Sequence, residues 1–176
     1  MTKAKGNIIL GIERSHFAFY MAHDFFVKGI EVTKEVHPPE FRFNTKNHWR
    51  ICYPVCVLAF GLELGLKGFL TQKQAKAAGH RLISMYHKID PAIQDAIENH
   101  FETCKAHRYG FFNVEYKPSN ASITKTTSRL AKDKITDALQ RNGQPFIDFR
   151  YLYEKDKKDT YSFDFNIIIR LTHAAL

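Results

Sequence analysis

The segment 51-ICYPVCVLAFGLELGLKGFLTQ-72 constrains the fold most strongly, because it is apolar around nearly its whole helical circumference. Pro54 suits the first turn of a helix, and we predict that the helix runs from there to the end of the segment. A helix that is apolar on all sides is buried at the centre of a protein. Gly61, Gly65 and Gly68 each cost about 1 kcal/mol of helix propensity relative to alanine. Their presence predicts that neighbouring helices pack closely against them.

The same segment carries one ion pair, Glu63 and Lys67, at the four-residue spacing that suits a helix. An exposed pair of this kind contributes only about 0.2–0.5 kcal/mol. Burying a charge costs several kcal/mol unless partners satisfy it. The pair therefore indicates either a polar site in a cleft or at a subunit interface, or the one wet edge of the helix, with Lys67 reaching outward.

The totals predict one globular domain over 1–176, with 44% hydrophobic and 25% charged residues. A net charge of +8 favours a polyanionic partner such as RNA, DNA or an acidic protein, or else simply a soluble basic protein. Three cysteines without a secretory leader predict reduced thiols in the cytoplasm. The apolar stretch is interrupted by Pro54 and Glu63 and ends at Lys67, so we expect no membrane span.

The rest of the chain predicts an all-α fold, a five- to seven-helix up-and-down bundle with at most a minor strand near 110–116. Positions 32–47 are expected to form a loop, and 167-III-169 could be a strand instead of part of the last helix. Asp90 followed by Pro91 is a helix start signal. Besides the central helix, apolar periodicity and start signals predict helices over 12–28, 80–88, 91–105, 122–141, 145–154 and 163–176.

A basic stripe is expected on the helix predicted over 122–141. Lys125, Arg129 and Lys132 would fall within about 60° of one another on its polar side. They are the candidate nucleic-acid-binding residues. The alternative is an ordinary solvated helix face.

Two groups of histidines are also candidates. His80 and His87 lie seven residues apart, with Ser84 between them, and could transfer protons or contact phosphate, or could cap helices. His100, Cys104 and His107 have helical spacing that could converge on a metal, with ligands added from Cys52 and Cys56. None of these spacings matches a zinc-finger or HExxH pattern, so neither a metal nor another cofactor is predicted.

The order of three short motifs resembles the HEPN superfamily of small helical proteins. In this sequence they are 63-ELGLK-67, 79-GHRL-82 and 149-FRYLYE-154, within a resemblance that covers roughly 12–155. The resemblance implies a dimerising helical bundle linked to RNA. It also implies that Glu63, Lys67, His80 and Arg150 form a polar seam inside the bundle.

Active HEPN proteins are metal-independent ribonucleases in which four to six residues separate an arginine from a following histidine. The pairs Arg42…His48 and Arg81…His87 have this spacing, but both come early in the chain. The late segment 141-RNGQPF-146 begins like an active motif and has no following histidine within range.

The function expected from the resemblance is therefore an RNA- or nucleotide-binding module of a prokaryotic stress, defence or toxin–antitoxin system, acting as a homodimer without evident catalysis. The first alternative is an endoribonuclease that uses Arg81 and His87. The second is a scaffold that binds an acidic protein.

Overall fold

The computed structural model describes residues 2–36, 48–72, 79–104, 112–117, 122–127, 134–143, 145–150 and 161–176. The described part is mostly helical, which confirms the predicted helical bundle. In chain order the elements are α1 (Thr2–Val36), η1 (His48–Ile51), α2 (Cys52–Gln72), α3 (Leu82–Tyr86), α4 (Pro91–Thr103), β1 (Phe112–Lys117), β2 (Ser122–Thr127), α5 (Ile135–Arg141), α6 (Pro145–Arg150), β3 (Tyr161–Asp164) and α7 (Phe165–Ala174).

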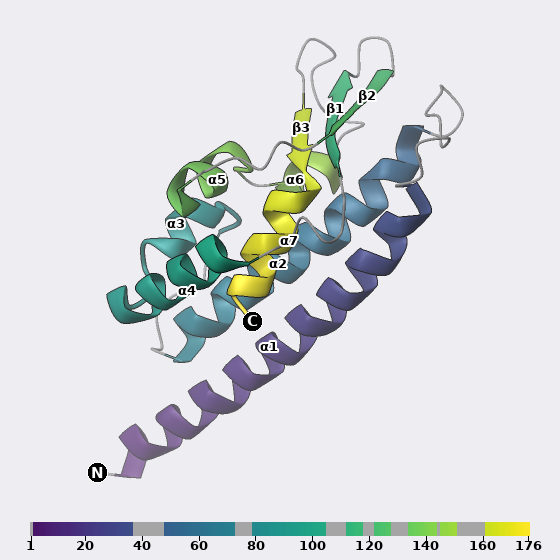
Figure 1. Ribbon diagram of the computed structural model, residues 1–176. Coiled ribbons are helices and arrows are strands. Elements are labelled where there is room, and N and C mark those ends of the chain that lie inside the picture. Colours follow the sequence, from purple (N-terminus) through teal and green to yellow (C-terminus); the bar gives the residue numbers. More distant parts are fainter. Residues whose placement is uncertain are drawn as a thin grey trace.

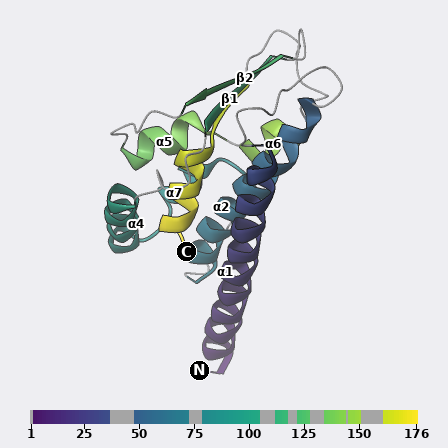
Figure 2. The same ribbon diagram turned by 45° about the vertical axis from the view of Figure 1, so that its right-hand side comes forward.

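Helix α2 lies between α1 and α7, and α4 packs on α7 (Figure 1 and Figure 2). The predicted close approach of a neighbouring helix is confirmed at Gly61, where a Cβ atom would lie 3.2 Å from the carbonyl oxygen of Ala22 in α1. A Cβ atom at Gly65 would lie 3.4 Å from the carbonyl oxygen of Ala175, just after α7, which is an ordinary contact. The propensity lost at Gly61 is thus offset by the close packing of α1 on α2.

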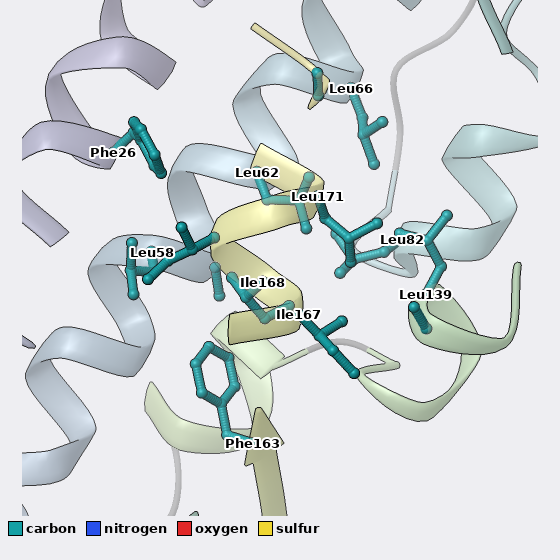
Figure 3. Packing of buried hydrophobic residues seen from close by; sticks show 14 of the residues in the cluster. Phe26, Leu58, Leu62, Leu66, Leu82, Leu139, Phe163, Ile167, Ile168 and Leu171 are labelled. Atoms are coloured by element: carbon teal, nitrogen blue, oxygen red, sulfur yellow. The ribbon is translucent and has the colours of Figure 1, made fainter. Parts of the chain in front are cut away.

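The hydrophobic core surrounds α2 (Figure 3). Leu58, Leu62 and Leu66 are at most 1% exposed, and they meet Ile168 and other apolar residues of α7. Each such leucine contributes about 1.5–3 kcal/mol by leaving water. The central, buried position predicted for this helix is therefore confirmed.

An antiparallel sheet with strand order β2-β1-β3 lies at the end of the molecule where α1 ends and α2 begins (Figure 1). The predicted strand near 110–116 is present as β1. Strand β3 runs directly into α7, and the Asp164 side chain accepts a hydrogen bond of 3.0 Å from the backbone N–H of Ile167. This N-cap ends the strand and starts the helix. The run 167-III-169 is consequently helical.

Several sequence predictions were wrong in their boundaries; the helix predicted over 163–176, for example, begins at Phe165, after strand β3. The helix predicted over 122–141 is divided into strand β2 and helix α5. The stretch 122-SITKTT-127 is rich in β-branched residues, which favour a strand when a partner such as β1 is available. Helix α1 extends well beyond the predicted 12–28 and includes positions 32–36, which were expected to belong to a loop. Positions 37–47 lie outside the described residues.

Within the described ranges, α2 is the one helix long and apolar enough, by length and composition, to cross a membrane. Of its most apolar window, 67% is buried inside the protein. The core helix of a globular protein has the same character, so this feature is weak evidence for a membrane span.

Candidate functional site

The carboxylate of Glu63 is buried in the protein and satisfied by two side chains. Glu63 is only 1% exposed, although it belongs to the most apolar helix of the chain. Lys67, one turn later, places its Nζ atom 2.7 Å from Glu63 Oε1. The pair is therefore much less solvated than the exposed Lys28–Glu31 pair on α1. The sequence allowed either a polar site in a cleft or at a subunit interface, or a wet edge of the helix. The burial of Glu63 agrees with the polar site.

His80 completes the site from the segment between α2 and α3. Its Nδ1 atom lies 2.9 Å from Glu63 Oε1 and 3.1 Å from Oε2. Gly79 has a φ of 93°, a backbone conformation that glycine adopts without strain, and this turn leads the chain into His80. The polar seam predicted from the resemblance therefore has three of its members, Glu63, Lys67 and His80, in direct contact.

The charges of Glu63 and Lys67 balance each other, so the seam does not require a positive charge on the His80 ring. An ionised Glu63 and a charged Lys67 neutralise each other, and a carboxylate can only accept hydrogen bonds. His80 therefore donates from Nδ1, which leaves its Nε2 as an acceptor when the ring is neutral. The His80 side chain is 44% exposed, whereas its carboxylate partner is buried. The arrangement fixes the orientation of a histidine at the protein surface.

A row of partly buried aromatic rings leads to this histidine. Phe25 of α1 makes an edge contact with Phe60 of α2, at 4.9 Å between ring centroids. Phe60 stacks on Phe146 of α6 at 4.7 Å, and Phe146 lies 6.2 Å from the His80 ring. We call Phe25, Phe60, Phe146 and His80 the aromatic column. The column ends at the surface with His80.

Two arginines lie beside the outer end of the aromatic column. Arg150, the fourth predicted member of the seam, is exposed, and its Cζ atom lies 5.4 Å from the centroid of the Phe146 ring. Arg81 directly follows His80 and is exposed. The backbone N–H of Leu82 donates to the Gly143 carbonyl at 3.2 Å, which ties the start of α3 to the segment leading into α6. Two separate parts of the chain thus supply cations to one edge.

The candidate catalytic pair is separated by the length of α3. Arg81 is the N-cap of that helix and His87 is its C-cap. Both are exposed, and the His87 ring lies beside the Tyr86 ring. They therefore stand at opposite ends of one short helix. Of the other pair with the same spacing, Arg42 lies outside the described residues and His48 begins η1.

The basic helical stripe does not exist as predicted. Lys125 belongs to β2, opposite Val114 of β1, so the angular spacing calculated for a helix does not apply to it. Arg129 and Lys132 lie outside the described residues. The predicted helical stripe is therefore wrong at Lys125, which is the one of the three candidates within the described residues.

A second cluster joins α4 to α7. His100 Nε2 lies 2.9 Å from His173 Nδ1, and Cys104 Sγ lies 3.9 Å from that same atom. His107 lies outside the described residues, while Cys52 and Cys56 are on the first turns of α2. Among the residues with described positions, no three or more His, Cys, Asp or Glu side chains are arranged to hold a metal ion.

Sequence reasoning missed Phe60, Phe146 and His173. Their roles depend on helices that meet only in the folded protein, and the local sequence around them carries no signal for it. No protein-family model, curated protein or solved structure matches this chain. The candidate site consequently stands on its geometry and chemistry.

Proposed function

We propose that this protein is a HEPN-like RNA-binding module of a prokaryotic stress, defence or toxin–antitoxin system, and that RNA contacts the outer end of the aromatic column. The observation that carries the proposal is the combination of a half-exposed ring, His80, with the exposed cations Arg81 and Arg150 beside it. Unpaired bases stack on histidine rings and on guanidinium planes, and phosphates are attracted by arginine.

The charge distribution supports this partner. Lys67 neutralises the one carboxylate of the seam, and burial keeps that carboxylate away from a bound anion. The arginines at the edge therefore act on a phosphate with little opposition from Glu63. The whole chain carries a net charge of +8, which favours the approach of a polyanion from any direction.

The site supports binding better than catalysis. His80 is oriented by a buried carboxylate. Arg81 and His87 of the expected ribonuclease motif come early in the chain, and the late segment 141-RNGQPF-146 has no following histidine within range. The endoribonuclease alternative therefore has less support than a binding module. The scaffold alternative predicts no affinity for RNA and is distinguished from the proposal by experiment.

The test measures the affinity for a labelled single-stranded RNA by fluorescence anisotropy. It compares two variants, each of which lacks one positive charge. Arg81→Ala is expected to weaken binding about tenfold, since one lost stacking or phosphate contact is worth about 1–3 kcal/mol. Arg14→Ala removes the same charge from an exposed position on α1 and is expected to change binding less than about twofold. Equal effects of the two substitutions would contradict the proposed site.

A further inference from the structure

The contact between His100 and His173 is a hydrogen bond between two titratable rings. Their facing nitrogens are 2.9 Å apart, and the ring centroids are 5.0 Å apart with 32° between the planes. One nitrogen must donate and the other must accept, so only one of the two facing nitrogens can carry a proton. A second proton would abolish the acceptor and place two positive rings in contact.

The surroundings of the pair oppose a second positive charge. Cys104 of α4 lies next to His173, and Phe26 of α1 packs near the same ring at 6.2 Å. On α7 the preceding cation, Arg170, donates to the Phe101 carbonyl at 2.6 Å and lies 4.0 Å over the Phe101 ring. In the described part of the chain these neighbours are neutral or positive. Although both histidines are exposed residues, partial desolvation, together with His100, lowers the pKa of His173.

The end of α4 that carries His100 is attached to the rest of the protein by a small set of described contacts. Ile97 and Phe101 are the buried residues of α4. The other described contacts near this end are those of Arg170, the histidine pair and Cys104. Both histidines lie in the last turns of their helices, where the helix dipole favours a first proton on the pair. The second proton then meets a like charge.

We propose that His100 and His173 form a proton-controlled clasp, which holds the end of α4 on α7 at neutral pH and releases it in mild acid. The direction of this pH dependence follows from the pKa of His173, which is lower in the folded state than in the unfolded state. A lowered pKa means that the folded state binds the proton less well than the unfolded state does. The stability from the clasp is present above the ordinary histidine pKa of 6.5 and is lost as the pH falls below that value.

Hydrogen exchange of the full-length protein, followed by mass spectrometry and corrected for intrinsic rates, tests the clasp. Between about pH 7.5 and about pH 5, protection of 97–104 should fall about tenfold or more in the wild type. In His173→Gln, whose amide does not titrate, the change should be less than about twofold. His87→Gln, at an exposed histidine outside the pair, should keep the wild-type response.

His100→Gln provides a second variant that should behave like His173→Gln, should the first one unfold. An equal loss of protection in wild type and in both glutamine variants would overturn the proposal. Constant protection of 97–104 in the wild type across this range would also overturn it.

Discussion

The Nδ1 atom of His80 lies 2.9 Å from the Oε1 atom of Glu63, and it joins a surface histidine to a carboxylate buried inside the most apolar helix of the chain. This contact ties the segment after α2 back onto α2. It also sets the direction of the exposed imidazole edge. The polar seam is therefore both a structural link and the base of the proposed binding surface.

The ion pair within α2 should stabilise the fold much more than an exposed pair does. Lys67→Met leaves the Glu63 carboxylate buried with only His80 as its partner, and it should lower the free energy of unfolding by about 2 kcal/mol. Urea unfolding monitored by circular dichroism measures the change. Lys28→Met breaks the exposed Lys28–Glu31 pair on α1 and should have little effect. Equal stabilities of the two variants would show that burial does not matter at Glu63.

The close packing of α1 on α2 should make Gly61 intolerant of a side chain. The added Cβ atom of Gly61→Ala would lie 3.2 Å from the Ala22 carbonyl oxygen and 3.3 Å from the Phe26 nitrogen, which are backbone atoms that cannot turn aside. We expect a loss of about 1 kcal/mol after the gain in helix propensity.

Gly65→Ala is the matched control, because its nearest neighbour would be at 3.4 Å, an ordinary contact. It should be neutral or slightly stabilising. Thermal unfolding followed by circular dichroism measures the stability of both glycine variants. A Gly61→Ala protein as stable as Gly65→Ala would refute the packing argument.

The thiols at the start of α2 should react slowly in the folded protein. Burial raises the pKa of Cys52 to about 11 and that of Cys56 to about 12. Near pH 8 their thiolate fractions are about 100-fold and 1,000-fold below that of an ordinary thiol. Alkylation with iodoacetamide, located by peptide mass spectrometry, should be slow at both cysteines and fast after unfolding in guanidinium. Rapid alkylation at Cys52 in the native protein would argue against its burial.

Tyr86 should make the protein sensitive to alkali. Burial, with smaller effects of Glu98 and Asp95, raises the pKa of Tyr86 to about 12 from an ordinary value of 10.0. The folded state therefore holds the proton more tightly than the unfolded state. The contribution of Tyr86 to the free energy of unfolding is fully present below pH 10 and is lost as the pH rises toward about 12.

The Tyr86→Phe variant lacks this titration, so its stability relative to wild type should improve over that interval. Urea unfolding at a series of alkaline pH values measures the difference. Parallel stability curves for the two proteins would contradict the prediction.

Local signals explain which parts of the fold could be predicted from the sequence. Two of these signals need no distant partner: the apolar segment of α2 and the Asp90–Pro91 start of α4. Both are present in the structure. At the start of α4, Asp90 accepts a 3.0 Å hydrogen bond from the Ala92 N–H. The error at 122–127 came from a distant partner, because pairing with β1 decides that this stretch is a strand. The helical spacing of Lys125 with later basic residues was therefore a misleading signal, since Lys125 lies in a strand.

The candidate site divides in the same way. Glu63 and Lys67 interact within one helix, so their spacing was informative. The position of His80 was suggested by the order of motifs rather than by local physics. Phe146 reaches Phe60 through the packing of α6 on α2, and His173 reaches His100 through the packing of α7 on α4. Contacts between helices that are distant in the chain leave no periodic pattern in a single sequence.

The most direct test of the central claim is the binding of a short mixed-sequence RNA to the wild-type protein in EDTA, at about 50 mM and about 200 mM salt. We predict binding at the lower salt, a loss of affinity of about tenfold or more at the higher salt, and RNA that remains intact throughout. Absence of binding at low salt would contradict an RNA-binding module and favour a protein-binding scaffold. Cleavage of the RNA in EDTA would contradict binding without catalysis and favour the endoribonuclease.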